Sequence, residues 1–278
     1  MGHSSGVRLL IFKKNNPGCP CCNCPCACYP FDGDSTDSAG SKHLTAVNEL
    51  YTSDDGAAKM AGSTYFKGDD HKCYEIGTEG LALWFWLKPE TECGTTAAPH
   101  FEGVVTKSTV NLSGGLGNLL DGEWGVCWHN STSPGTGFAG ILYFVAKPTG
   151  GTDFITVGQG GALWFRGLST SDGWTFFFLW MSPDERKMYA IVNNNSTLEE
   201  SLPAGESFTA SGTNDMYVGN NEGYAILGSQ AIGTVTNRTF NMDNLGFCKE
   251  IGTKAEMEAR ATKLYNNGSG LACNKAGL

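Results

Sequence analysis

Apolar residues fill alternate positions on both faces of the segment that runs from Asp172 to Asn194. One face would carry Trp174, Phe176, Phe178 and Trp180, and the other would carry Thr175, Phe177 and Leu179. A period of two indicates a β-strand, and apolar residues on both faces predict that the strand is buried between two layers. A turn is expected at residues 182–185, where Pro183 suits the first central position, and residues 187–192 then return as a second strand. The segment therefore predicts a β-hairpin from the core of a sandwich.

The same kind of pattern predicts further strands. Residues 81–87 are apolar at every position, which predicts a doubly buried strand stopped by Pro89. Residues 124–128 and 141–146 resemble a pair of strands separated by a Gly- and Ser-rich loop. Shorter strands are expected at residues 154–157, 162–165, 216–219 and 240–247. Strands at short spacing with turn residues between them predict an all-β sandwich.

One helix is expected after the last strand. Thr253 and Glu256 have the spacing of a capping box. The next apolar positions, which fall on one helical face, are Met257, Ala261 and Leu264. Residues 266–268, Asn-Asn-Gly, supply a left-handed stop. The pattern predicts a single amphipathic helix that lies against the outside of the sandwich.

Composition narrows the classes of partner. The chain has 278 residues, 38 of them Gly, and a formal net charge of −9. An acidic chain without a basic run is poorly suited to nucleic acid, because phosphate contacts need clustered Lys and Arg. No apolar run is long enough to cross a bilayer. The apolar patch at residues 7–12 is too short for the core of a signal peptide, so we expect synthesis in the cytosol.

The cysteines are unevenly distributed. The chain has 11 cysteines, an odd number, which forbids complete pairing within one chain. Six of them lie in one run: Cys19, Cys21, Cys22, Cys24, Cys26 and Cys28. Pro20 and Pro25 favour an extended course for this run. We therefore divide the chain into a Cys-rich arm (1–28), one domain (29–268) and a tail (269–278).

Several states of the cysteine run are compatible with the sequence. Neighbours this close rarely pair with each other without strain. Disulfides to another subunit, or to the distant Cys73, Cys93 or Cys273, suit an extended arm better. Thiolates could also hold zinc, although the run lacks two well-separated Cys-x-x-Cys pairs. A reduced connector is the remaining alternative.

The order of motifs resembles a known family. The matching segments are residues 29–34, 65–70, 83–88, 174–193 and 240–247, followed by the capped helix. This order is similar to that of concanavalin A-like jelly rolls of the laminin G-like class. The resemblance implies an all-β jelly-roll sandwich with one C-terminal helix, to which the Cys-rich arm is added. That family includes lectins, carbohydrate-binding modules, adhesion domains and virion proteins, so the resemblance alone does not choose a function.

The sequence does not indicate an enzyme. Retaining glucanases of this superfamily carry their carboxylates on one strand as Glu-x-Asp-x-x-Glu, and the chain has no such run. Asp184-Glu185 falls in a turn and Glu199-Glu200 in a loop-like segment, which is typical of solvated carboxylates. The 5 histidines lack metal-ligand spacing, and the chain has no Walker loop. We expect a protein without catalytic residues.

Two kinds of ligand site are suggested. The resemblance implies a structural calcium ion as the one candidate cofactor, with Asp32 and Asp243 as the best ligands, although such aspartates also make turn hydrogen bonds. Aromatic residues near predicted strand ends are candidates to stack on a glycan. They are Trp128, Tyr143, Trp164 and Tyr224. Each of them is also a candidate for ordinary packing.

Three functions follow from these expectations. The first is a structural protein of a virion, such as a phage capsid decoration or tail protein, or of another surface assembly. It would display the jelly roll and use the arm to join other structural subunits. The second is a secreted carbohydrate-binding or adhesion module that binds a cell-surface glycan. A glycan-cleaving enzyme ranks last, because no carboxylate pair supports it.

Overall fold

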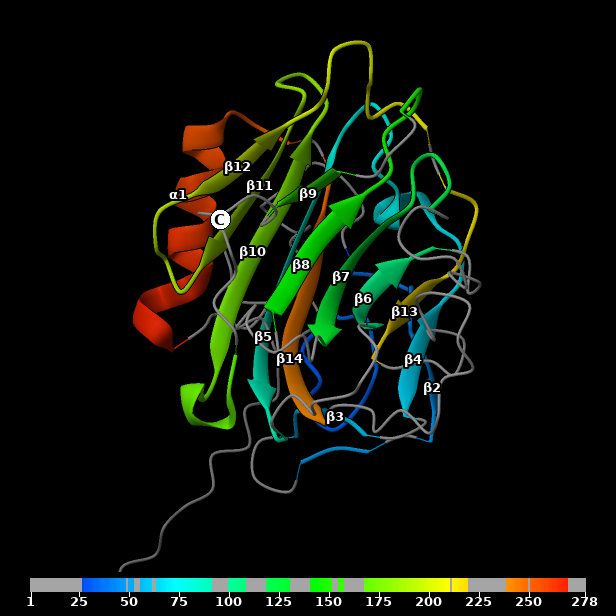
Figure 1. Cartoon of the computed structure of the whole chain (residues 1–278). Helices are drawn as coiled ribbons and strands as arrows, with labels where there is room; N and C mark the ends of the chain where they lie inside the picture. The colour runs from blue at the N-terminus through cyan, green and yellow to red at the C-terminus, as the bar shows by residue number, and fades with distance from the viewer. Residues whose placement is uncertain are drawn as a thin grey trace, which may run out of the picture.

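The chain forms a β-sandwich of two antiparallel sheets with one α-helix on its outside (Figure 1). The computed structural model describes residues 27–48, 50–52, 56–61, 64–91, 100–108, 119–130, 141–151, 155–157, 168–210, 212–219, 239–249 and 251–269. Within this part of the chain, no helix is both long and apolar enough to cross a membrane. The prediction of an all-β sandwich with a C-terminal helix is confirmed.

Sheet A has the strand order β1-β14-β5-β10-β11-β12, and β3 also pairs with β14. Its strands are β1 (Cys28–Tyr29), β3 (Ala58–Met60), β5 (Leu81–Pro89), β10 (Thr175–Ser182), β11 (Lys187–Val192), β12 (Leu198–Ser201) and β14 (Phe240–Cys248). The predicted hairpin is β10 with β11, and Arg186, with a positive φ of 53°, completes the turn between them. A register shift between Asp243 and Gly246 marks an irregularity in β14 where it pairs with β5.

Sheet B has the strand order β2-β4-β13-β6-β7-β8-β9. Its strands are β2 (Thr45–Val47), β4 (Tyr65–Gly68), β6 (His100–Lys107), β7 (Trp124–Asn130), β8 (Ile141–Ala146), β9 (Ile155–Val157) and β13 (Met216–Val218). The predicted pairing of residues 124–128 with residues 141–146 is confirmed as β7 with β8. The expected strand at residues 162–165 lies outside the described residues.

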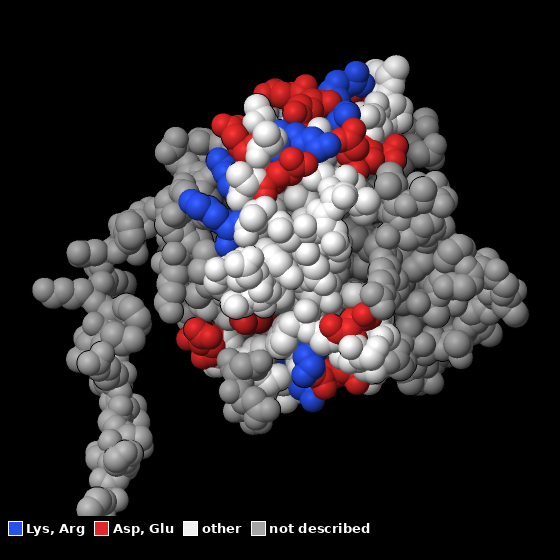
Figure 2. All heavy atoms as spheres, turned by 90° about the vertical axis from the view of Figure 1, so that its left-hand side faces the viewer, with Lys and Arg blue, Asp and Glu red and all other residues white. Residues whose placement is uncertain are grey.

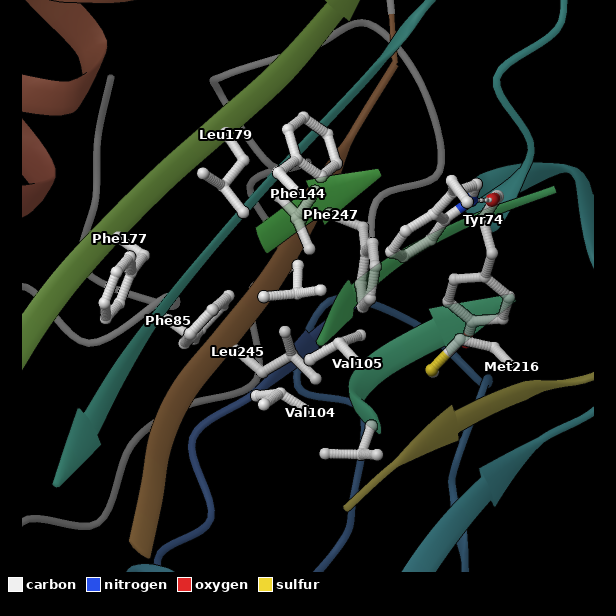
Figure 3. Close-up of a cluster of buried hydrophobic side chains, with 14 of the residues drawn as sticks. Tyr74, Phe85, Val104, Val105, Phe144, Phe177, Leu179, Met216, Leu245 and Phe247 are labelled. Atoms are coloured by element: carbon white, nitrogen blue, oxygen red, sulfur yellow. Dashed lines mark hydrogen bonds between the residues drawn. The ribbon is translucent and has the colours of Figure 1, made fainter. Parts of the chain in front are cut away.

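Sheet A is the middle layer of the molecule, which explains why its strands are apolar on both faces. In β10, Phe177 and Leu179 face sheet B, whereas Phe176 and Phe178 face the helix. Figure 3 shows the inner layer, where Phe85, Phe177 and Leu179 of sheet A meet side chains of sheet B. The sheet B side chains drawn there are Val104, Val105, Phe144 and Met216. The two apolar faces of β10 therefore belong to two separate apolar layers, one between the two sheets and one between sheet A and the helix.

Helix α1 (Lys254–Tyr265) covers the outer face of sheet A. Thr253 and Glu256 form the predicted capping box, and Asn266 ends the helix in the left-handed conformation (φ 45°, ψ 51°). The buried face consists of the three residues expected for it: Met257, Ala261 and Leu264. They pack with Trp84, Trp86, Phe176, Phe178 and Trp180 of the sheet. Both the existence and the placement of the helix are confirmed.

Ion pairs fix the first turn of α1 to the edge of sheet A. Glu199 of β12 contacts the Nζ atoms of Lys187 and Lys254, each at 2.7 Å. Hydrogen bonds from Lys187 and then Lys254 lower the pKa of Glu199. Figure 2 shows this side of the molecule, where basic and acidic side chains lie next to each other above an uncharged area. Neither sign of charge dominates this face.

The sandwich begins before residue 29. Cys28 pairs with Gly246 in β14, and the carbonyl of Ala27 accepts a hydrogen bond of 2.9 Å from the backbone N–H of Phe247. Ala27 and Tyr29 are both buried in the core between the sheets. We assigned Cys28 to the arm, and this assignment is corrected: residues 27–29 are part of the domain. The local sequence did not reveal this, because a strand of two residues carries no periodic pattern.

Candidate functional site

Two tyrosines lie side by side on the face of sheet B that points away from the core. Phe66 of β4 and Val218 of β13 are buried between the sheets. Because side chains alternate along a strand, Tyr65 and Tyr217 point outward. Their ring centroids are 6.2 Å apart and the rings are tilted by 54°. Both side chains are half-buried, so one part of each ring contacts protein and the other part contacts solvent.

A salt bridge borders the tyrosine pair. Lys67 Nζ lies 2.6 Å from the carboxylate of Asp215, and both side chains are partly exposed. The hydrogen bond to Asp215 raises the pKa of Lys67, so this ammonium is charged at neutral pH. Burial, and then the nearby charge of Asp215, raises the pKa of Tyr217, so its hydroxyl is neutral. We call Tyr65, Lys67, Asp215 and Tyr217 the tyrosine–aspartate patch.

The loops beneath the patch are held by a buried lysine. Lys107 at the end of β6 has a side chain that is 0% exposed and forms an ion pair with the carboxylate of Asp70. Its Nζ also donates a hydrogen bond to the carbonyl of Asn214. The Asn214 amide in turn donates to the carboxylate of the buried Glu123. These bonds connect the loop after β4 with the loops before β13 and β7.

Asp70 connects this buried network to the patch. Its backbone N–H donates a hydrogen bond of 3.0 Å to the carboxylate of Asp215. Asp215 therefore has two partners, Lys67 and the Asp70 backbone, and its position is fixed before any ligand arrives. A fixed carboxylate next to two aromatic rings suits a polar ligand with apolar C–H faces, because the rings supply stacking area and the carboxylate accepts hydrogen bonds.

The structure places the four predicted glycan-stacking residues differently from one another. Trp128 is 0% exposed and packs against Phe240 in the core, so the prediction that it stacks on a sugar is wrong. Tyr143 is half-buried in β8, and burial raises its pKa. It lies on the outward face, because Leu142 and Phe144 face the core, but two strands separate β8 from β13. Trp164 and Tyr224 lie outside the described residues.

The predicted calcium ligands do not gather with further ligands in the described residues. Asp32 is exposed in the turn after β1, and Asp243 is half-buried in β14. Nowhere in the described part of the chain do three or more His, Cys, Asp or Glu side chains lie together in a group that could hold a metal ion. Calcium binding by Asp32 and Asp243 stays a prediction.

The described cysteines fall into two classes. Cys28 and Cys248 are disulfide-bonded, whereas Cys73 and Cys127 are buried thiols. Burial raises the pKa of the Cys127 thiol to about 12, which makes it unreactive. Because Cys73 is a buried thiol and not part of a disulfide, the suggestion that the arm pairs with Cys73 is corrected. The remaining candidates, which include Cys19, Cys21, Cys22, Cys24, Cys26, Cys93 and Cys273, lie outside the described residues.

The comparisons support the fold without assigning a family. No protein-family model matches the sequence, and no curated protein matches it. Among solved structures, the botulinum neurotoxin serotype D binding domain aligns at 11% identity with a TM-score of 0.54, over 84% of this chain and 50% of that chain. The binding domain of Paraclostridial Mosquitocidal Protein 1 aligns at 11% identity with a TM-score of 0.55, over 83% of this chain and 49% of that chain.

A third solved structure contains a bound sugar acid. The botulinum neurotoxin serotype D ligand binding domain in complex with N-acetylneuraminic acid aligns at 12% identity, with a TM-score of 0.54, over 84% of this chain and 50% of that chain. The chain therefore spans about half the length of the solved structures that it matches. At this identity the likeness shows the fold alone, a β-sandwich.

Proposed function

We propose that this chain is a non-enzymatic carbohydrate-binding module and that the tyrosine–aspartate patch is its binding site. The observation that carries the proposal is the half-exposed pair Tyr65 and Tyr217 beside the fixed carboxylate of Asp215. Aromatic faces pack against the C–H face of a sugar ring, while Asp215 and Lys67 offer an acceptor and a donor for its hydroxyl groups. The lectin-like sandwich supports this class of ligand. Within that class, the motif order favours a concanavalin A-like jelly roll of the laminin G-like type.

The charges of the patch suit binding better than hydrolysis. A glycosidase needs one carboxyl group that donates a proton and a second carboxylate across the scissile bond. Asp215 and Asp70 are instead each engaged by a lysine ammonium, Lys67 and Lys107 respectively. The bound glycan should therefore be released intact.

The first test replaces the most central ring of the patch. We expect Tyr217→Ala to weaken binding to immobilised oligosaccharides by about tenfold or more, because the stacking surface is lost. The measurement is a titration against a panel that contains lactose and 3′-sialyllactose, with the sugars analysed afterwards for cleavage. Tyr217→Phe retains the ring and should keep most of the affinity.

The matched control is Leu120→Ala. Leu120 is 56% exposed and lies in the loop before β7, so its replacement should leave glycan binding unchanged. If the wild-type protein binds no sugar on the panel, the carbohydrate proposal is contradicted. If it binds and Tyr217→Ala binds equally well, the location of the site is wrong.

We further propose that the module is displayed by an assembly, such as a virion or a cell surface, through the Cys-rich segment before residue 27. The density of cysteines there supports this role, because exposed thiols need to be covered or bonded. The full chain should give species larger than a monomer on non-reducing gels that collapse with reductant. Deleting residues 1–26, which leaves Ala27 and β1 in place, should remove those species. Persistence of the larger species after the deletion would contradict the idea.

A further inference from the structure

A histidine caps the turn that supports the tyrosine–aspartate patch. His71 precedes the short 3-10 turn η1 (Lys72–Tyr74), and its Nδ1 atom accepts a hydrogen bond of 3.0 Å from the backbone N–H of Cys73. The backbone carbonyl of His71 accepts a second bond, of 2.9 Å, from Tyr74 N–H. An imidazole nitrogen that accepts a hydrogen bond must carry a lone pair, so the cap requires the neutral ring.

The residue next to His71 is the one that positions the patch. Asp70 donates its backbone N–H to Asp215 at 3.0 Å and its carboxylate holds the buried Lys107. The cap at His71 and the bond to Asp215 are thus made by adjacent residues of one chain segment. A change in the backbone of the η1 turn therefore moves the Asp70 N–H relative to Asp215.

We propose that protonation of His71 opens the η1 turn and thereby weakens ligand binding at the tyrosine–aspartate patch. The inference rests on the proposed function for the link to binding, whereas the opening of the turn rests on geometry alone. Once Nδ1 carries a proton, it and the Cys73 N–H are two donors that face each other at hydrogen-bonding distance, and the cap cannot persist. The loss of the cap releases the segment that holds Asp215.

The surroundings of His71 determine the direction of the effect. Lys42 from the segment after β1 and Lys72 from the turn itself disfavour the charged ring, while Glu75 and Asp70 favour it. The ring of Tyr74 lies against the imidazole at a centroid distance of 6.3 Å. Burial, followed by the two lysines, lowers the pKa of His71 below its ordinary value of 6.5.

The sign of the pH dependence follows from this lowered pKa. A group whose pKa is lower in the folded state binds its proton more readily when the structure opens. The cap is therefore fully formed above the ordinary histidine pKa and is lost as the pH falls through the lower pKa of the folded protein. Binding at the patch should be tight at neutral pH and weak in acid.

The test uses a side chain that accepts the same bond and does not titrate. His71→Asn places an amide oxygen as the acceptor for Cys73 N–H, and Asn is a favourable cap. Two quantities are measured from about pH 7.5 down to about pH 4, which extends below the ordinary histidine range because the pKa of His71 is lowered. They are the hydrogen-exchange protection of the Asp70 and Cys73 amides, corrected for the intrinsic rate, and the affinity for the oligosaccharide that binds in the panel.

The wild-type protein should lose protection at both amides and lose affinity several-fold over this range, whereas His71→Asn should lose neither. The control is His43→Asn. His43 Nδ1 also accepts a backbone hydrogen bond, from Asp37 at 3.1 Å, but lies outside the η1 turn. This variant should therefore keep the wild-type pH dependence at the turn.

The outcomes separate the two proposals. Protection that is independent of pH in the wild type, or equal pH dependence in His71→Asn, overturns the role of His71. Opening of the turn without any change in affinity overturns the link to the patch. If no sugar binds at any pH, the proposed function fails, and the exchange data still test the turn.

Discussion

Replacing Phe176 with alanine should lower the free energy of unfolding by about 3–5 kcal/mol. Phe176 is 0% exposed and lies in the layer between sheet A and α1. Its ring centroid is 5.2 Å from that of Trp86 and 5.9 Å from that of Tyr265. Removing the ring leaves a cavity beneath the helix that these rigid aromatic neighbours cannot fill. Chemical denaturation followed by tryptophan fluorescence measures the change.

Two controls isolate the cavity in this experiment. Phe176→Leu keeps most of the apolar volume and should cost less than the alanine variant. The exposed Leu120→Ala should change the free energy of unfolding by no more than about 0.5 kcal/mol. A near-zero change for Phe176→Ala would mean that α1 does not cover this part of sheet A.

Adding a single methyl group at Gly246 should be as damaging as removing the ring of Phe176. A Cβ atom at Gly246 would lie 2.8 Å from Cη2 of the Trp84 indole and closer still to two neighbouring ring atoms. Trp84 is itself buried and stacks on Phe178 at a centroid distance of 6.3 Å, so it has no room to retreat. We expect Gly246→Ala to cost about 3 kcal/mol or more in the free energy of unfolding, at the upper end of the range for overpacking.

The chain offers both a control and a rescue for this variant. A Cβ at Gly212 would meet its nearest atom, in Glu123, at 3.4 Å, an ordinary contact, so Gly212→Ala should be tolerated. Trp84→Leu combined with Gly246→Ala should cost less than the sum of the single changes, because the smaller side chain relieves the clash. Strict additivity of the two changes would show that the indole does not lie over Gly246.

The local sequence pattern was sufficient to predict those elements whose structure is determined within a single segment. The hairpin at residues 172–194 and the helix after Thr253 depend on alternation, turn residues and capping, all of which can be read within a few positions. The second apolar face of β10 was also correctly predicted as buried. What the sequence could not show is which of the two sheets the outer helix α1 covers.

The identity of the site residues depended on which face of each strand points inward. In β7 the core-facing residues are Trp124, Val126 and Trp128, while Gly125 and Cys127 occupy the other face. Both sets are uncharged, so alternation alone did not settle that Trp128 faces the core. A clearer signal was present in Tyr65-Phe66-Lys67, where a lysine marks the outward face, and it would have placed Tyr65 at the surface.

No local sequence pattern predicts the hydrogen bonds and ion pair that connect Lys107, Asp70 and Asp215 at the tyrosine–aspartate patch. The hydrogen bond between Asp70 and Asp215 joins residues 145 positions apart, and Lys107 meets both neighbouring loops only because β13 lies between β4 and β6. Charged residues in loops look the same in sequence whether they are solvated or paired. Their pairing follows from strand order, and strand order is a property of the whole sheet.

The position of β14 in sheet A also determines when the protein can fold. Among the described strands, β14 is the last; it lies between β1, the first of them, and β5, and it pairs with β3 as well. Closing the sheet therefore brings together the two ends of the domain, a contact between distant parts of the chain that makes folding slow. During synthesis, the edge of β5 stays unpaired until β14 has been made, and the outer apolar face of β5 and β10 stays uncovered until α1 follows. Until that moment the growing chain carries an open sheet edge and depends on protection from aggregation.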